Sequence, residues 1–153
     1  MKNYLVKNIG VVNENKVAVM DVLIRKGRIE KIAGTIDVDF DAQEINGEGK
    51  YLLPGVIDDQ VHFREPGLTH KATIYSESKA AVAGGVTSFM EMPNTVPNAL
   101  TIALLEDKYT IAAQSSLANY SFFMGTANDN AEEVLRVNKL KKGICGVKIF
   151  MGS

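Results

Sequence analysis

The stretch from residue 55 to residue 67, GVIDDQVHFREPG, decides the fold, because it runs from an apolar strand into a polar segment that ends in a Pro-Gly turn. Downstream of it, segments with apolar residues at helical spacing alternate with short apolar runs typical of buried strands. Helices are predicted over Ile74–Ala83, Leu100–Gln114 and Asn130–Leu140, and strands over Val86–Met92, Tyr120–Met124 and Gly146–Phe150. The last helix is expected to begin at a cap on Asp129 or Asn130. This alternation predicts an α/β fold with parallel strands and right-handed crossovers.

Four parallel strands fit two folds, an open doubly wound sheet or half of an eight-stranded barrel. No G-x-G-x-x-G follows the first strand, so a dinucleotide site is not supported. The chain stops at residues 151–153, just beyond a strand, where βα proteins carry their chemistry. We therefore expect a truncated chain.

The first 50 residues predict short strands rather than helices. Alternating apolar residues over Asn3–Val12, Val17–Arg25 and Arg28–Ala33 indicate strands, and Lys26-Gly27 supplies a hairpin turn between the last two. We expect a small antiparallel β module over residues 1–52, followed by a βα domain over residues 53–153.

The composition is that of an ordinary soluble globular protein. Of 153 residues, 46% are hydrophobic and 23% charged, which excludes a mainly disordered chain. The net charge of −1 offers no field for nucleic acid or an anionic membrane. No apolar stretch approaches the ~20 residues that span a bilayer, and no signal peptide is expected at the start. The lone cysteine, Cys145, suits a reducing compartment, so a cytoplasmic location is expected.

Polar side chains gather where the first strand of the βα region ends. On extended backbone, side chains alternate, so one side is expected to carry Asp58, Gln60, His62 and Arg64, and the other Asp59, Val61 and Phe63. Two interpretations stay open from these residues alone. They form a functional cluster, or they are a loop start in which His62 caps the strand and Arg64 pairs with Glu65.

Residues 57–67, IDDQVHFREPG, resemble the D-x-H-x-H-x-R-E-P-G segment of dihydroorotases in the amidohydrolase superfamily. Two further stretches fit in the expected order, Met92-Pro93-Asn94-Thr95 after the second strand and residues 146–150, GVKIF, in the fourth. The resemblance covers the whole chain, but only half or less of such an enzyme. It implies the first half of a metal-dependent hydrolase (β/α)8 TIM barrel over residues 53–153, with residues 1–52 forming part of a composite β-sandwich.

The resemblance also implies roles for four residues. His62 matches the second histidine of a metal-binding pair suited to zinc. Lys148 matches the catalytic lysine that reacts with carbon dioxide to give a carbamate bridging two divalent metals, since burial favours its neutral, nucleophilic form. Without the resemblance, Lys148 would be a lysine that reaches solvent or pairs with an acid. Arg64 and Asn94 match the pair that holds the substrate carboxylate.

Gln60 departs from the family motif, which usually has a histidine there. An amide oxygen is a poorer zinc ligand than imidazole, so one metal position is expected to be weak or empty. Alternatively Asp58 assists, or the protein is a non-catalytic dihydroorotase-like subunit that partners aspartate transcarbamoylase. We favour an active enzyme with Gln60 as a weak metal ligand, because the other motif residues all remain.

The function implied is that of a zinc-dependent dihydroorotase. This enzyme interconverts dihydroorotate and N-carbamoyl-L-aspartate, small-molecule substrates, in pyrimidine biosynthesis, and a homo-oligomer is expected. An allantoinase or hydantoinase is a weaker alternative, because Arg64 suits a substrate carboxylate that those substrates lack. The remaining metal ligands and the proton-transferring aspartate would lie in the missing C-terminal half, so the chain alone is expected to be inactive.

Other conspicuous residues receive structural interpretations. His70 is expected to face solvent, and Cys145 to be a packed thiol. Met90 and Met92 are expected to fill the core. The side on which Glu91 lies stays open, either the barrel interior or a neighbouring helix.

Overall fold

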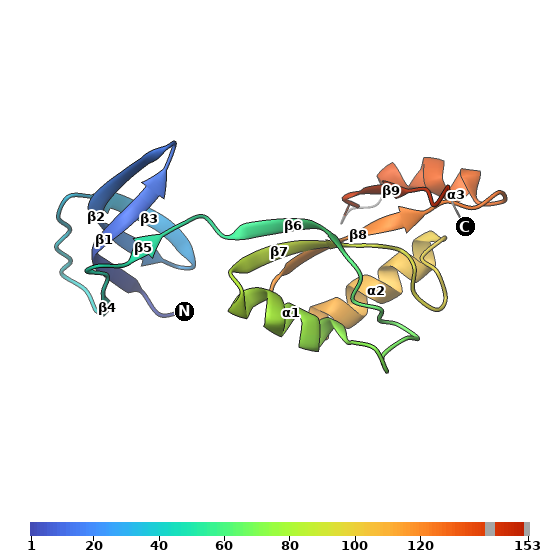
Figure 1. Ribbon diagram of the computed structural model, residues 1–153, viewed down its shortest axis with the longest axis horizontal. Coiled ribbons are helices and arrows are strands. Elements are labelled where there is room, and N and C mark those ends of the chain that lie inside the picture. Colours follow the sequence, from blue (N-terminus) through green and yellow to red (C-terminus); the bar gives the residue numbers. More distant parts are fainter. Residues whose placement is uncertain (140–142, 152–153) are drawn as a thin grey trace. The chain divides into compact units, whose positions relative to one another are not determined.

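The computed structural model describes residues 1–139 and 143–151 (Figure 1). The chain divides into two compact units, Met1–Pro54 and Gly55–Ser153. Each unit has its own sheet, and each is described by itself below.

The first unit is a five-stranded sheet. Its strands are β1 (Tyr4–Asn13), β2 (Lys16–Arg25), β3 (Arg28–Ala33), β4 (Gln43–Asn46) and β5 (Tyr51–Leu52). The predicted hairpin is present, and Lys26 and Gly27 at its turn have φ angles of 52° and 74°, which match the twist of the flanking strands. The predicted antiparallel pairing is present for β1, β2 and β3, but the prediction is wrong for β4 and β5, which both pair parallel to β1. The chain returns to β1 by loops, so neither strand is a hairpin partner.

The Asp21 side chain binds the backbone where the pairing of β1 and β2 is irregular. The β1–β2 register shifts between Val6 and Ile9, and Asn8 there has a φ of 55°. The buried Asp21 carboxylate accepts hydrogen bonds from the N–H groups of Asn8 and Ile36, both at 2.9 Å. It also forms an ion pair with the Lys7 ammonium at 2.7 Å. One carboxylate on β2 thus contacts both β1 and the loop after β3.

The second unit has the predicted parallel βα order. Its strands, β6 (Val56–Val61), β7 (Val86–Glu91), β8 (Asn119–Gly125) and β9 (Gly146–Lys148), are neighbours in chain order. The connecting helices are α1 (Ile74–Ala83), α2 (Ile102–Ser115) and α3 (Ala131–Arg136), and a 3₁₀ turn, Val137–Lys139, follows α3. Parallel strands need such crossovers, because a tight turn cannot join them.

The three helices cover the same face of this sheet. Side chains from all three connections, including Ile74, Leu105 and Val137, lie in one cluster with Phe89 and Phe122 of the strands. Figure 1 shows α1 and α2 along one side of β6–β8. A doubly wound sheet carries helices on both faces, whereas a barrel carries them only outside. The one-sided arrangement therefore favours the barrel among the two predicted folds.

The end of the last strand and the cap of the last helix differ from the prediction in an informative way. The strand predicted to reach Phe150 ends at Lys148, because Lys148 pairs with Gly125, the last residue of β8, and no ladder partner remains beyond it. Asn130 is the N-cap of α3, but its side chain makes no cap hydrogen bond. It donates instead to the carbonyl groups of Leu100 at 2.8 Å and Gly125 at 2.9 Å. The predicted end of this helix, Leu140, lies outside the described residues.

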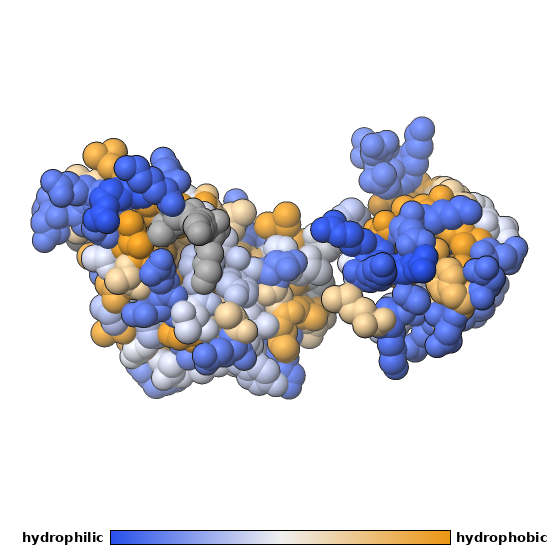
Figure 2. Space-filling view, turned by 180° about the vertical axis from the view of Figure 1, so that it is seen from behind, coloured by the Kyte–Doolittle hydropathy of each residue, from blue (hydrophilic) through white to orange (hydrophobic). Residues whose placement is uncertain are grey.

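Large apolar side chains also remain on the surface. Figure 2 shows apolar patches among the hydrophilic surface of both units. In the second unit those on the outer strands β6 and β9 and just after β9 are Val56, Ile57, Val147, Ile149 and Phe150. Both outer strands of the described parallel sheet thus carry exposed apolar residues.

Candidate functional site

The ends of β6 and β7 lie side by side and carry two of the motifs. The Met92 N–H donates to the Val61 carbonyl oxygen at 3.0 Å, just where both strands finish. Val61 and Phe63 pack into the core beneath the helices. Because side chains alternate along the strand, Gln60 and His62 belong to the opposite face, which no helix of the described residues covers.

His62 and Asn94 are brought together across this strand end. His62 Nδ1 lies 2.8 Å from Asn94 Oδ1. An amide oxygen can only accept, so Nδ1 carries the proton and donates, and the lone pair of the imidazole is on Nε2. A fixed Nδ1–H is how proteins orient a histidine that binds a metal through Nε2. The bond also leaves the Asn94 NH₂ group as the part able to donate elsewhere.

Arg64 departs from the alternation predicted for it. The strand β6 ends at Val61, and Arg64 has a left-handed φ of 71°. Its carbonyl accepts from the Leu68 N–H at 3.1 Å, which closes a turn. The direction of the Arg64 side chain therefore follows from this turn and not from strand alternation.

The Arg64–Glu65 pair of the alternative interpretation is absent among the ion pairs of residues 1–139 and 143–151. Glu65 Oε2 instead accepts from the Ile74 N–H at 2.7 Å, at the start of α1. A carboxylate at this position is favoured by the N–H groups of the first helical turn. Glu65 thus fastens the loop after β6 to the helix that follows.

The loops after β6 and β7 are also hydrogen-bonded to each other and packed together. The Val96 N–H donates to the Pro66 carbonyl at 3.1 Å. Gly67 has a φ of 82°, and a Cβ there would overlap the Val96 carbonyl oxygen. Thr95 is buried, and its hydroxyl donates to the Pro97 carbonyl at 2.9 Å. The two loops that carry Arg64 and Asn94 therefore form one packed layer.

Gln60 and Lys148, the other predicted metal ligands, are not joined to His62 by any hydrogen bond within the part of the chain that the structure describes. Gln60 is exposed, and its N–H donates to Asp58 Oδ1 at 3.1 Å. The Lys148 carbonyl accepts from the Thr126 N–H at 3.0 Å, which fixes the end of β9. The Lys148 ammonium lies 5.2 Å from the centre of the Phe150 ring.

These residues fit a divalent metal only in part. Among residues 1–139 and 143–151 no three His, Cys, Asp or Glu side chains gather as a ligand cluster. His62 offers one oriented imidazole, and the Gln60 amide is a weak ligand. Lys148 becomes an anionic ligand only after carbamylation. Within the described residues, His62 thus has no complete set of partner ligands for a metal.

A buried ion pair lies directly behind the strand ends. Glu91 Oε2 is 2.5 Å from Lys108 Nζ, and both side chains are only 1% exposed. The Lys108 ammonium also donates to the Met92 carbonyl at 3.1 Å. Burial raises the pKa of Glu91 and lowers the pKa of Lys108, while the charge of each partner opposes the other's shift. Glu91 thus faces helix α2, which settles the side left open by the sequence.

Sequence reasoning did not find this pair. The signal was present in Lys108, which lies three residues after Leu105 and four before Ala112, on the buried face of α2. A lysine at such a position needs a buried partner, and Glu91 was the acidic residue within a strand of apolar neighbours.

The exposure of His70, Met92, Met90 and Cys145 can be compared with the predictions made for them. His70 is exposed, and Met92 is 3% exposed within the core. Met90 is only partly buried. Cys145 is partly buried too, and burial raises the pKa of its thiol. None of the helices in the described residues is long and apolar enough to cross a membrane.

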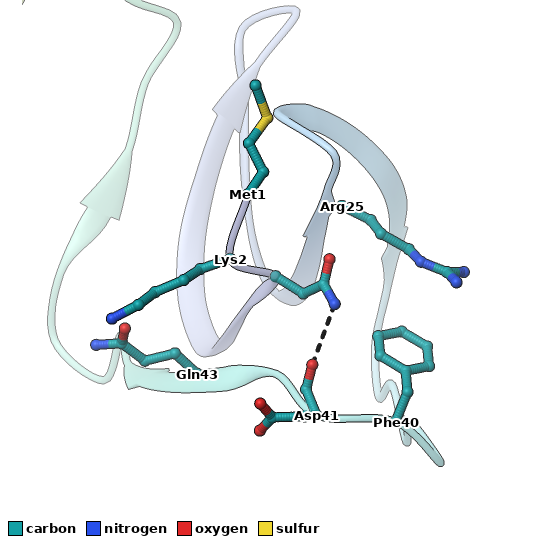
Figure 3. A pocket seen from close by; sticks show the side chains of 7 residues that line it. Met1, Lys2, Arg25, Phe40, Asp41 and Gln43 are labelled. Carbon is teal, nitrogen blue, oxygen red and sulfur yellow. Dashed lines mark hydrogen bonds between the residues drawn. The ribbon is translucent and has the colours of Figure 1, made fainter.

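A shallow pocket of about 470 Å³ lies in the first unit and is lined by Met1, Lys2, Asn3, Arg25, Phe40, Asp41 and Gln43. Figure 3 shows these side chains around its opening, with the Asn3 amide donating to the Asp41 carbonyl at 3.1 Å. The Arg25 guanidinium lies 4.5 Å from the centre of the Phe40 ring. None of the motif residues is among those that line this pocket.

Known proteins resemble both the sequence and the fold. A family model described as dihydro-orotase-like matches residues 49–146. The dihydroorotase of Carboxydothermus hydrogenoformans is 41% identical over 140 residues, which are 88% of this chain and 31% of that protein. The dihydroorotase of Methanosarcina acetivorans is 33% identical over 151 residues, 99% of this chain and 32% of that protein. The chain thus spans about a third of the length of these curated relatives.

Among solved structures, the chain is similar to the L-hydantoinase (dihydropyrimidinase) from Arthrobacter aurescens. That match has a TM-score of 0.90 and 27% identity, and covers 100% of this chain and 34% of the hydantoinase. The dihydropyrimidinase from Brevibacillus agri matches with a TM-score of 0.79 and 28% identity over 97% of this chain and 33% of its own. Because the family model covers most of the second unit and the end of the first, this chain belongs to the dihydro-orotase-like family.

Proposed function

We propose that this chain is the N-terminal part of a dihydroorotase, an enzyme that adds water across the ring amide of dihydroorotate and yields N-carbamoyl-L-aspartate, and that also runs the reverse cyclisation. The observation that carries the proposal is the 2.8 Å bond between His62 and Asn94, because it prepares one group for a metal and one for a substrate at the same strand end. The relatives named dihydroorotase support the choice of reaction.

The domain organisation follows from the same proposal. Residues 1–52 would form part of a composite β-sandwich, and residues 53–153 the first half of an eight-stranded barrel. The division of the chain after Pro54 and the helices on one face of the parallel sheet support this arrangement. Further residues of the enzyme would add the remaining strands beside β6 and β9 and complete the site. The enzyme would act in the cytoplasm, in pyrimidine biosynthesis, as a homo-oligomer.

We assign the metal-binding role to His62 through Nε2, with Lys148 as a carbamate and Gln60 as a weak third ligand. Carbamate formation joins the neutral Lys148 amine to carbon dioxide and releases one proton, so the side chain gains the negative charge that a cation favours. A divalent cation such as zinc would supply Lewis-acid polarisation of the ring amide. The Asn94 oxygen keeps the His62 imidazole in the tautomer that leaves Nε2 free to bind.

We assign the substrate carboxylate to Arg64 and Asn94. A guanidinium can bind a carboxylate through two parallel hydrogen bonds, and the Asn94 NH₂ group can add a third donor. Dihydroorotate has such a carboxylate, whereas hydantoin has none. Arg64 therefore favours dihydroorotate over the substrates of the hydantoinases that the fold resembles.

The test uses the full-length protein that contains this chain. Metal content and turnover of dihydroorotate, hydantoin and N-carbamoyl-L-aspartate are measured for the wild type, for His62→Asn and for the matched control His70→Asn. We expect His62→Asn to lose metal and turnover together, because it removes the imidazole. His70 is exposed and lies outside the motif residues, so its variant should behave as wild type. Turnover of hydantoin without dihydroorotate, or equal effects of both variants, would overturn the proposal.

Gln60 provides a second test, which separates the enzyme from a non-catalytic subunit. Gln60→His should tighten metal binding, because imidazole is a better zinc ligand than an amide. Unchanged metal stoichiometry and affinity would contradict the placement of Gln60 in the metal site. A full-length wild type that neither binds metal nor turns over dihydroorotate would instead be a subunit without activity.

A further inference from the structure

The Glu65 side chain links the residue next to Arg64 to the start of helix α1. Its Oε2 atom accepts a hydrogen bond from the Ile74 N–H at 2.7 Å, nine positions further along the chain. Ile74 is completely buried in the core, and its N–H, in the first turn of the helix, has no carbonyl partner within the helix. The bond therefore closes the loop between β6 and α1 against a fixed point of the core.

The helix start has a cap of its own. The Thr73 hydroxyl accepts from the Ser76 N–H at 3.1 Å, and the Ser76 hydroxyl accepts from the Thr73 N–H at 3.0 Å. This reciprocal pair is a capping box, made within four neighbouring residues. The helix thus begins at a complete local cap, and the Glu65 bond adds a link from the helix to the loop before it.

Arg64 lies at the other end of this link, in a turn with unusual backbone. Its φ of 71° is in the left-handed region, which residues with side chains rarely adopt and keep only where their surroundings hold them. The Arg64 carbonyl accepts from the Leu68 N–H, and the Pro66 carbonyl accepts from the Val96 N–H, both at 3.1 Å. Glu65 stands between these two backbone contacts, so its side chain fixes the same turn to the helix.

We propose that Glu65 is a positioning residue that holds the turn at Arg64 and so sets the affinity for the substrate carboxylate. This rests on the proposed function in its assignment of Arg64 to the substrate. A carboxylate beside a guanidinium can also compete with an acidic substrate for it. The bond to Ile74 directs the Glu65 carboxylate to the helix, so Glu65 acts on Arg64 through the backbone of the turn.

The experiment compares the full-length wild type with three variants. Glu65→Ala removes the acceptor, whereas Glu65→Gln retains one acceptor oxygen without the charge. The matched control is Glu77→Ala, because Glu77 is the acidic residue in the first turn of α1. Its carboxylate accepts from the Ser76 hydroxyl at 3.1 Å, so this control removes a carboxylate from the same helix start without touching the link to the loop.

KM and kcat for dihydroorotate are measured together with hydrogen exchange at the Ile74 and Leu68 amides. We expect Glu65→Ala to raise KM about tenfold with a smaller change in kcat, because a displaced Arg64 binds the carboxylate less well. Both amides should exchange at least about tenfold faster, since the first loses its acceptor and the second reports the turn at Arg64. Glu65→Gln should restore KM to near the wild-type value, and Glu77→Ala should leave KM and the Leu68 amide unchanged.

An Arg64→Met background shows whether the effect passes through Arg64. There, Glu65→Ala should raise KM no further. An equally large rise in KM in that background, a KM that Glu65→Ala leaves unchanged or lowers, or unchanged exchange at Leu68 would overturn the positioning role.

If Glu65→Ala does not fold, Glu65→Asp takes its place, because the shorter side chain withdraws the carboxylate from the Ile74 N–H while keeping the charge. The same rise in KM and faster exchange at Leu68 are then expected, and their absence would overturn the proposal. A wild type without dihydroorotase activity would refute the proposed function and the effect on substrate affinity with it. The exchange rate at Leu68 would then decide whether Glu65 holds the turn.

Discussion

Removing the Asp21 carboxylate should destabilise the first unit more than any surface change there. The side chain is 1% exposed and is the acceptor for three donors that come from β1 and from the loop after β3. Asp21→Ala leaves those donors without a partner and opens space at the register shift of β1.

The magnitude follows from which donors are buried. The Ile36 N–H is buried, and leaving it unpaired costs about 1 to 3 kcal/mol. The Asn8 N–H lies nearer the surface and adds about 1 kcal/mol. The Lys7 ammonium reaches solvent, so the loss of that ion pair adds little. The sum is a loss of about 2 to 4 kcal/mol, a large part of the stability of a small domain.

Native-state hydrogen exchange at the Leu5 and Val22 amides measures the free energy of opening of this unit separately from the second. The control is Asp39→Ala, an exposed aspartate in the loop after β3, which should change that free energy by less than about 0.5 kcal/mol. A loss under about 1 kcal/mol for Asp21→Ala, or one equal to the control, would refute the role given to the carboxylate.

The first unit should also be acid-sensitive. Hydrogen bonds from Lys7 and the backbone lower the Asp21 pKa from 3.8 to about 2. The stabilisation that the ionised carboxylate gives is therefore complete above pH 3.8 and is lost as the pH falls toward 2. The same exchange experiment across this range should show the free energy of opening fall in wild type and not in Asp21→Ala. Gly67→Ala should lower Tm and raise the KM for dihydroorotate, because the new Cβ would overlap the Val96 carbonyl oxygen. The control Gly85→Ala has a similar φ but open space around the new Cβ, so it should lower Tm by less. Arg64→Lys should raise KM for dihydroorotate about tenfold or more, because an ammonium cannot form the two parallel bonds, and an unchanged KM would contradict the assignment.

The order of elements was predictable because it depends on local patterns. Apolar spacing in α1 and α2, the glycines after α1 and the short apolar strands each act within a few residues, and the observed order β6-β7-β8-β9 agrees with them. The motif residues His62 and Asn94 were also identified from the sequence, and the structure brings them within hydrogen-bonding distance.

The errors have a common cause in contacts between distant segments. Strand alternation was extended to Arg64, but the strand ends at Val61, where the Met92 N–H of the neighbouring strand end donates to the Val61 carbonyl. The parallel pairing of β4 and β5 with β1 and the short β9 likewise depend on which strand is the neighbour. No pattern within one segment contains that information.

The sequence by itself determined the alternation of strands and helices, the resemblance to dihydroorotases and the residues that carry it, because hydrophobic spacing and motif order are properties of one segment at a time. Only the tertiary structure decided the tautomer of His62 and the partner of Lys108. Each of these depends on a donor meeting an acceptor from a segment at least 16 residues away, as Lys108 and Met92 do, and burial then makes an unpaired group costly.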